Sequence, residues 1–408
     1  MSTSRVPVLL ILFSAFLAAA ANGIALVAFP WLVLQRTGNA TGASIVAGAA
    51  TLPLVFATLL SGTAVDFLGR RRVAMLSDAM SALSLAAIPV LTMAMGADIL
   101  NTALLSGLAA LGALFDPAGI TARQSMLPEA TARAGWTLDH TNSLYEAGFN
   151  LGYITGPGVG GMLIAAIGGI NTMWVTAGAF GLSILSMAML RLHGADRPDP
   201  EQRPDGVVSG VMEGLRFVWH NRVLRTLGLI DLALIGLYLP MESVLFPKYF
   251  SDRNEPAQLG WVLMALSIGG LIGALSWTLL SRIASRRTTV LTAIAIYGVA
   301  ITVIAFLPPL PLILVLVALI GLVYGPIGPI YNTLLQSRTP EHLRGRVVGV
   351  MTSMAYASGP LGLMLAGPLI DTFGLKAAFI TLAVPILAVA TACPWIPALR
   401  ELDDAPLG

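Results

Sequence analysis

The sequence predicts an all-α membrane protein with twelve transmembrane helices in two pseudo-symmetric six-helix bundles. Three observations support this prediction: an apolar composition, a series of long apolar segments, and short motifs that recur in the same order in both halves. Of the 408 residues, 56% are hydrophobic and only 11% are charged, whereas soluble domains carry about 25% charged residues. So few charges cannot cover a water-exposed surface, and we therefore expect a lipid bilayer as the chain's main partner.

The apolar segments are continuous and about 20 residues long, the length of a membrane-spanning helix. Since the first one extends beyond a usual cleavable leader, we expect it to remain as the first helix. The segments fall at approximately 8–34, 42–65, 73–95, 99–120, 141–165, 170–190, 223–247, 258–280, 289–307, 311–334, 347–370 and 376–398.

The distribution of Lys and Arg predicts the orientation in the membrane. Nineteen of the 23 lie before segment 1, in the loops after the even-numbered segments, or in the C-terminal tail. Because cytoplasmic loops carry an excess of basic residues, we expect both termini in the cytoplasm.

A linker near the middle of the chain divides it into two halves. The loop 192–221 is rich in Pro and charge at its centre, 194–206, which is typical of a flexible connection. We expect an N-terminal bundle at 1–192, a linker at 193–221 and a C-terminal bundle at 222–408. Residues 207–220 place apolar side chains at helical spacing, which predicts either an amphipathic helix on the inner membrane surface or an extension of segment 7.

The two halves share short motifs, which indicates a duplicated six-helix unit. Two such halves around a midplane cavity are the architecture of alternating-access transporters. The recurring pairs are Phe29-Pro30 with Phe246-Pro247, Gly156-Pro157 with Gly359-Pro360, and, more weakly, Arg70–Arg72 with Arg286-Arg287.

The loop after segment 2 carries the most specific motif, with Gly62, Asp66, Gly69, Arg70 and Arg71 at fixed spacing. A glycine permits a tight turn between antiparallel helices, and arginines hold such a loop against anionic lipid. The pattern resembles the G-x-x-x-D-x-x-G-R-[RK] loop of the major facilitator superfamily. The resemblance implies that this loop acts as a gate, which latches the two halves together in the outward-facing state.

Segment 5 contains small residues four apart, followed by a proline: Gly152, Gly156, Pro157, Gly160 and Gly161. Small residues let helices approach closely, and proline removes a backbone hydrogen bond. The run resembles the superfamily's antiporter motif, G-x-x-x-G-P-x-x-G-G, which is typical of drug exporters. An ordinary small-residue packing face is the alternative.

Five further stretches resemble the exporter branch that contains macrolide, tetracycline and siderophore pumps. They lie at 28–34, 115–118, 127–129, 142–144 and 213–219. Within that branch, the chain most resembles the actinobacterial Tap-type multidrug exporters. One feature departs from many drug–proton antiporters, which carry an arginine within segment 4. Residues 101–120 contain none, and Arg123 lies at the predicted cytoplasmic end. A proton relay of that kind is therefore not transferred to this chain.

Acidic residues inside apolar segments are costly, so each is a functional candidate. Asp231 and Glu242 lie about three turns apart in segment 7, where both can face one side and exchange a proton for a cationic drug. Interhelical hydrogen bonding is the alternative. Glu146 is a candidate gate, proton site or salt-bridge partner, and Asn22 can orient a substrate or bond another helix. Tyr238, with five other aromatic residues, could line a cavity for flat cations.

Two further acids suggest structural roles. Asp116, near the end of segment 4, is expected to pair with Arg70 or Arg71 and hold the gating loop. Asp78 lies shallow in segment 3, and we expect no function for it. The single cysteine, Cys393, excludes an intramolecular disulfide and is expected to be a buried apolar residue.

Together these features predict a secondary exporter of amphipathic drugs and not an enzyme, since there is no Walker loop and the four His lack metal-ligand spacing. We expect no cofactor, no metal and no nucleic-acid partner. The species that we expect it to transport are small amphipathic substrates and protons, and we expect the chain to be a monomer. A siderophore or metabolite exporter of the same fold is one alternative. A non-transporting membrane receptor or scaffold, which would favour degenerate gating motifs, is the other.

Overall fold

The computed structural model describes residues 4–192, 207–339 and 343–403, and within these ranges the chain is helical without any β-strand. The long helices of the first half are α1 (Val6–Thr37), α2 (Ala40–Leu68), α3 (Arg70–Met95), α4 (Thr102–Ala134), α5 (Leu138–Ile167) and α6 (Gly169–Ala188). Those of the second half are α8 (Arg222–Pro240), α9 (Phe246–Ser251), α10 (Pro256–Leu280), α11 (Arg286–Ile304), α12 (Leu310–Tyr324), α13 (Ile327–Arg338), α14 (Arg344–Phe373) and α15 (Leu375–Ala392), and α7 (Val207–His220) precedes them.

Eleven helices in the described ranges are long and apolar enough to cross a membrane. The remaining predicted segment, 347–370, lies within the 30-residue helix α14. The predicted all-α, twelve-helix membrane fold is thereby confirmed.

The fourth predicted segment ends too early. Helix α4 continues fourteen residues past the predicted end at 120, to Ala134, and stops at Gly135, whose φ of 69° takes the chain out of the helix. Hydropathy falls after Ile120 because Arg123 and Glu129 follow, although helical geometry continues through both. Arg123 therefore lies inside a long helix and not at the end of one.

Two predicted segments are interrupted helices. The seventh consists of α8, a π-helical turn at Met241–Leu245 and the short α9. The tenth is broken at Gly325 and Pro326 into α12 and α13. In both places a proline lies at the interruption, where it cannot donate the hydrogen bond that a continuous helix needs.

Helix α7 is separate from α8 and is not an extension of it. Asn221 between them has an extended backbone (φ −81°, ψ 109°), and its side chain accepts hydrogen bonds from the amides of Val223 and Leu224 to cap α8. Val218 of α7 is fully buried in a cluster with residues of α8, α13 and α14.

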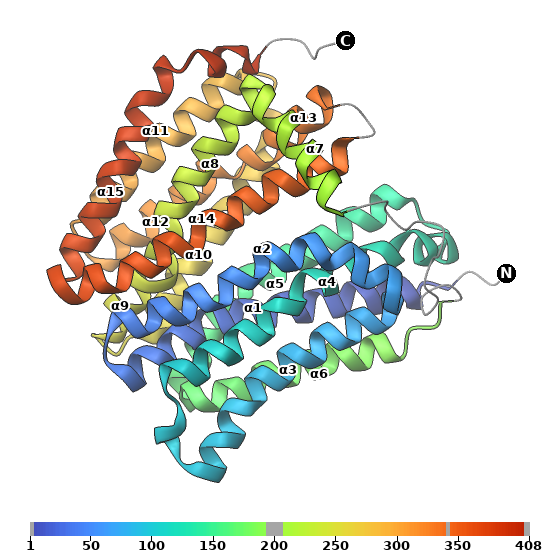
Figure 1. Cartoon of the computed structure of the whole chain (residues 1–408), viewed down its shortest axis with the longest axis vertical. Helices are drawn as coiled ribbons and strands as arrows, with labels where there is room; N and C mark the ends of the chain where they lie inside the picture. Colours follow the sequence, from blue (N-terminus) through green and yellow to red (C-terminus); the bar gives the residue numbers. More distant parts are fainter. Residues whose placement is uncertain (1–3, 193–206, 340–342, 404–408) are drawn as a thin grey trace. The chain divides into compact units, whose positions relative to one another are not determined.

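The described contacts divide the chain into two compact units. One comprises Met1–Asp205 with Phe250–Gly260, and the other comprises Gly206–Tyr249 with Trp261–Gly408. In the first unit the most extensive helix contacts join α1 to α5 and α2 to α4, and α3 lies beside α6 (Figure 1). In the second unit α8 packs most extensively on α14, and α11 lies beside both α12 and α15 (Figure 1).

Candidate functional site

A carboxylate in the second unit is held by a tyrosine from a neighbouring helix. Asp231 lies near the middle of α8, and its Oδ1 accepts a hydrogen bond of 2.9 Å from the hydroxyl of Tyr324, at the end of α12. The break after Tyr324 ends α12 at that point, which places the tyrosine at a helix terminus. No described ion pair includes Asp231. A carboxylate that lacks a cation partner within the membrane is a functional candidate and not an ordinary salt bridge.

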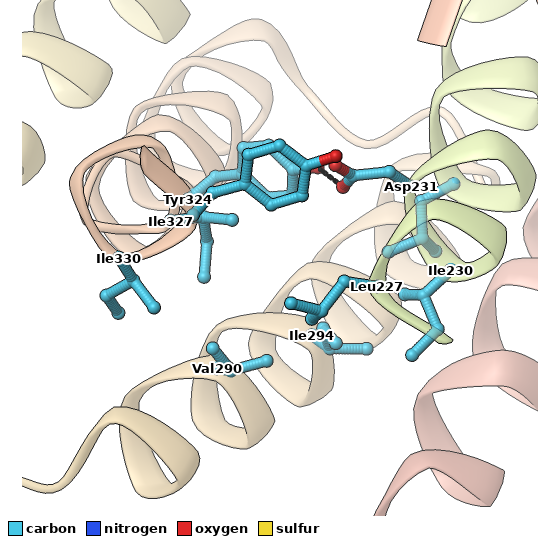
Figure 2. A pocket seen from close by; sticks show the side chains of 10 residues that line it. Leu227, Ile230, Asp231, Val290, Ile294, Tyr324, Ile327 and Ile330 are labelled. Atoms are coloured by element: carbon cyan, nitrogen blue, oxygen red, sulfur yellow. Dashed lines mark hydrogen bonds between the residues drawn. The ribbon is translucent and has the colours of Figure 1, made fainter. Parts of the chain in front are cut away.

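Asp231 and Tyr324 lie in the wall of a small cavity (Figure 2). Its volume is about 20 Å³, which exceeds the 10–15 Å³ or so that one water requires. Apart from Asp231, Tyr324 and Tyr331, the described residues that line it are aliphatic and come from α8, α11 and α13: Leu227, Ile230, Leu234, Val290, Ile294, Ile327 and Ile330. A cavity with three polar groups and room for one water suits a proton or a water molecule, and it is far smaller than a drug.

Glu242 lies in the π-helical turn that follows Pro240. A π turn is rare and occurs frequently at functional sites. The Glu242 carboxylate makes no described hydrogen bond or ion pair, and Glu242 lies about one helical turn after Tyr238. The predicted candidates Asp231, Tyr238 and Glu242 thus belong to the same interrupted helix.

The first unit contains a buried ion pair whose hydrogen bonds reach four helices. Arg123 of α4 donates to both carboxylate oxygens of Asp78 on α3, and the two side chains are 3% and 2% exposed. Ser14 of α1 accepts from Arg123 Nε at 2.8 Å, and Ser183 of α6 donates to Asp78 at 2.7 Å. The sequence did not predict this pairing: Asp78, near the start of α3, is the buried partner of Arg123.

Asp116 does not pair with the gating loop. Two turns before Arg123 on α4, it accepts a hydrogen bond of 3.0 Å from Ser81 of α3, and Asn22 of α1 lies within hydrogen-bonding reach of it. No described ion pair joins it to Arg70 or Arg71, so the expected pairing is wrong. The side chain instead points to α1 and α3, because its position on α4 is on the face that packs against them.

The gating-loop motif is a one-residue turn. α2 ends at Leu68 and α3 begins at Arg70, and Gly69 between them has a φ of 86°, which favours glycine. Arg71 donates a 2.8 Å hydrogen bond to the carbonyl oxygen of Leu190, after the end of α6. Gly62 and Asp66 belong to α2, but their side-chain surroundings lie outside the described part of the structure.

The small residues of α5 form its contact with α1. A methyl group added at Gly152 would lie 2.6 Å from the carbonyl oxygen of Phe16, and one at Gly156 would lie 2.6 Å from that of Ala20. Gly160 faces Ile24. Gly161 faces another way, toward the first turn of α10, where Pro256 lies, and Pro157 contacts Gly23. The predicted motif therefore makes backbone-to-backbone packing possible on two sides of α5.

Glu146, the remaining predicted acid, is exposed on α5, next to the buried Tyr145. The Tyr145 hydroxyl is buried without a hydrogen-bond partner among the described residues.

Two functional features were not predicted from the sequence: Tyr297, and the pairing of Arg123 with Asp78. Tyr297 lies in α11 and is 3% exposed, in ring contact with Tyr238 and Tyr324. The feature of the sequence that could have indicated these residues is their polarity. Tyr297, Arg123 and Asp78 all lie within long helices that are otherwise mostly apolar.

Comparison with known proteins gives this architecture a family. The model of the Major Facilitator Superfamily matches residues 11–363 and 243–406. The chain is 65% identical over 404 residues to the multidrug efflux pump Tap of Mycolicibacterium fortuitum, with 99% of each chain covered. It is 60% identical to the multidrug efflux pump Tap of Mycobacterium tuberculosis, covering 99% of this chain and 97% of the relative.

A solved structure supports the same fold. The crystal structure of a mutant of the nucleoside transporter NupG matches with a TM-score of 0.79 at 12% identity, over 96% of this chain and 99% of that one.

The helices, the interrupted segments and the membrane-embedded carboxylates define a multi-pass membrane transporter, not an enzyme. The chain belongs to the Major Facilitator Superfamily.

Proposed function

We propose that this chain is a secondary active exporter that moves amphipathic drugs across the cell membrane by alternating access, in exchange for protons. The observation that carries the proposal is the identity of 65% and 60% to two multidrug efflux pumps over nearly the whole length of each chain. The matches extend over 99% of this chain, so they include every predicted membrane segment. Small amphipathic molecules are therefore the proposed substrates.

Proton exchange is supported by the contrast between the buried acids. Asp78 is neutralised by Arg123, and such a pair has no free carboxylate to take up a proton. Asp231 and Glu242 have no cation partner in the described structure, and a carboxylate in that position can alternate between its acid and its charged form. We propose both as proton-coupling residues, with Glu146 as a candidate gate or proton site and with Asn22 and Tyr238 as candidate substrate contacts.

Alternating access agrees with the size of the cavity beside Asp231. Sites for drug-sized ligands measure about 300–1,000 Å³, whereas this cavity measures about 20 Å³. A drug can reach Asp231 only after the surrounding helices move apart. Gly62, Asp66, Gly69, Arg70 and Arg71 are proposed to gate that movement.

We further propose that the chain works as a monomer with both termini in the cytoplasm, and that its bundles are 1–192 and 222–408, joined by the linker 193–221. The basic residues concentrated on one side of the predicted spans support this orientation.

Siderophore export is a second candidate, because the chain is 28% identical over 261 residues to the enterobactin exporter EntS of Shigella dysenteriae. That match covers 62% of this chain and 60% of the relative, which makes it weaker support than the full-length matches. Two assays separate drug export from siderophore export. A drug exporter raises the inhibitory concentration of drugs for the cells that express it. A siderophore exporter restores siderophore secretion to a secretion-deficient strain.

Transport into inverted membrane vesicles tests the proposal. With an imposed pH gradient, acid inside, vesicles containing the protein should accumulate ethidium and tetracycline, and a protonophore should abolish the accumulation. Vesicles without the protein are the control. If a panel of cationic dyes and tetracyclines shows no gradient-dependent uptake, drug–proton exchange is rejected.

Neutral variants test the two proton sites. Asp231→Asn and Glu242→Gln should each lose gradient-driven uptake by roughly 100-fold, the usual scale for removing a proton-transfer group. Asp98, in the short 3-10 turn after α3, provides the matched control as Asp98→Asn. Full drug resistance in both Asp231→Asn and Glu242→Gln would remove these residues from the coupling mechanism.

A further inference from the structure

Three tyrosines from three helices form a continuous row in the second unit. The ring centroids of Tyr238 (α8) and Tyr297 (α11) are 5.9 Å apart, and those of Tyr297 and Tyr324 (α12) are 6.1 Å apart. Both distances fall in the range of direct aromatic contact. We call Tyr238, Tyr297 and Tyr324 the tyrosine row.

A carboxylate lies at each end of the tyrosine row. At one end, the Tyr324 hydroxyl donates to Asp231 at 2.9 Å (Figure 2). At the other end, Glu242 lies about one helical turn after Tyr238 on the same interrupted helix, and Tyr238 packs its ring against Tyr297. Asp231 and Glu242 are eleven residues apart on the same interrupted helix, which corresponds to about 16 Å along its axis. This separation is too long for direct contact between the two side chains, so a proton that moves from one to the other needs carriers between them.

The surroundings of the row favour proton movement along it. The cavity beside Asp231 and Tyr324 has room for one water, and Tyr331 is the only other polar side chain among the described residues of its wall. No described cation pairs with either carboxylate. Beside Asp231, the described groups that can carry a proton are therefore the hydroxyls of Tyr324 and Tyr331.

We propose that Asp231 and Glu242 form one coupled proton site, and that the tyrosine row carries the proton between them. This inference rests on the proposed proton-coupled function and identifies the groups that serve it. Glu242, as the acid, gives its proton to the hydroxyl oxygen of Tyr238 or Tyr297. The rings are in contact without a described hydrogen bond between their hydroxyls, so we propose that a bridging water takes the proton of each hydroxyl and gives one of its own to the next. The Tyr324 hydroxyl passes its proton directly to the Asp231 carboxylate, with which it is hydrogen-bonded. Glu242 ends as a carboxylate and Asp231 as an acid, and every tyrosine is neutral before and after.

Aromatic packing is the competing explanation for the row, and tyrosine-to-phenylalanine variants separate the two. The variants Tyr297→Phe and Tyr324→Phe keep the rings and their contacts but remove the hydroxyls. Each is compared with the wild type in two vesicle assays, both with ethidium. The first is uptake driven by a pH gradient, which requires the proton to move. The second is exchange of internal for external ethidium without any gradient, which requires only substrate binding and the conformational change.

If the tyrosine row carries the proton, Tyr297→Phe and Tyr324→Phe should lose gradient-driven uptake by at least about 10-fold, toward the usual range for a proton-transfer group. Both variants should keep ethidium exchange within about 2-fold of the wild type. Retained exchange also shows that the variants are folded. Tyr153→Phe is the matched control, since Tyr153 of α5 lies in the first unit, is 42% exposed and packs its ring against Phe149; it should behave as wild type in both assays.

A second measurement uses the double variant Asp231→Asn/Tyr324→Phe. If both residues serve one pathway, the double variant is no worse than Asp231→Asn alone, because effects within one unit are not additive. Normal gradient-driven uptake by Tyr297→Phe and Tyr324→Phe would overturn the relay. So would a parallel loss of ethidium exchange, which would assign the hydroxyls to substrate binding or folding. If wild-type protein exchanges ethidium but shows no gradient-driven uptake, proton coupling itself fails, which is a separate result.

Discussion

The buried pair of Arg123 and Asp78 differs physically from the acids of the second unit. The guanidinium and the carboxylate are almost fully enclosed, and Ser14 and Ser183 complete their hydrogen bonds. Such a pair contributes little net stability compared with apolar residues, but losing one partner leaves an uncompensated buried charge. We therefore interpret Arg123 and Asp78 as positioning residues that fix α1, α3, α4 and α6 against one another.

This interpretation gives a prediction for stability. Arg123→Met should destabilise the protein by about 3–5 kcal/mol, because Asp78 is left buried without its partner. The paired variant Asp78→Leu/Arg123→Met should recover most of that loss. Arg133→Gln is the control on the same helix: its pair with Glu129, at 3.9 Å, is partly exposed and should cost below about 1 kcal/mol.

Thermal unfolding of the purified protein in detergent measures these differences. The interpretation is wrong if Asp78→Leu/Arg123→Met is as unstable as Arg123→Met, since the instability would then not arise from an unpaired charge.

At the scale of single elements, the α1–α5 contact depends on the absence of side chains. The Gly156 backbone lies directly on α1, where an added methyl group would be 2.6 Å from the Ala20 oxygen and 2.8 Å from the Cα of Gly23. Neither backbone group can turn aside. At Gly148, two turns earlier on the same helix, an added methyl group meets no atom within 4 Å.

These two glycines form a matched pair for mutation. Gly156→Ala should destabilise the protein by about 1–3 kcal/mol, the range for an overpacked contact, and should reduce drug export. Gly148→Ala should stay within about 0.5 kcal/mol of wild type. Melting temperature and drug resistance in cells are the measurements. Equal behaviour of the two variants would show that close approach of α1 and α5 is not required.

Helix α7 presents two different apolar faces. Val218 is buried against the other helices of the second unit. On another side of α7, three apolar side chains lie within one sector and are exposed: Met212 (59%), Leu215 (38%) and Trp219 (53%). Arg225 lies over the Trp219 ring at 5.9 Å. Trp219 precedes the membrane span beginning at Arg222 by three residues, and tryptophan prefers that depth in the membrane.

We predict that α7 lies in the membrane surface. A nitroxide spin label attached through Leu215→Cys should collide mainly with oxygen, which dissolves in lipid, whereas a label at Glu213→Cys should collide mainly with a water-soluble nickel complex. Both positions are exposed, and residues two apart on an α-helix point in nearly opposite directions. The two labels therefore differ mainly in the direction they face. Equal accessibility of both labels to the nickel complex would place α7 in water.

The same elements show what the sequence can predict. Continuous apolar segments are long and strongly patterned, so the number and type of the membrane helices followed directly from them. Hydropathy is a poor guide where a charged residue lies inside a helix. The predicted fourth segment ended before Arg123, although α4 continues past it. The carboxylate that neutralises Arg123 comes close to it only in the folded chain. The partners of Asp78 and Asp231 are 45 and 93 residues away. No local pattern connects such pairs, and Tyr297 was missed for the same reason.

For the molecule as a whole, the charge distribution gives a prediction about orientation. If both termini are cytoplasmic, green fluorescent protein fused to the C-terminus should fluoresce, because it folds in the cytoplasm but not after export through the general secretion pathway in its unfolded form. Alkaline phosphatase fused at the same place should be inactive. A fusion after residue 38, in the first predicted outer loop, should give the reverse pair of results. Active phosphatase at the C-terminus would invert the proposed topology.

The π-helical turn at Met241–Leu245 has a consequence for the direction in which side chains face along this helix. A π turn contains one more residue than the α-helical turn that it replaces, whereas α1, which carries the matching Phe29-Pro30 pair, is a single α-helix. The extra residue rotates the helix before the turn by about 100° relative to the helix after it. Relative to Phe246 and Pro247, Asp231 and the rest of α8 therefore face a different side from the one that α1 presents relative to Phe29 and Pro30.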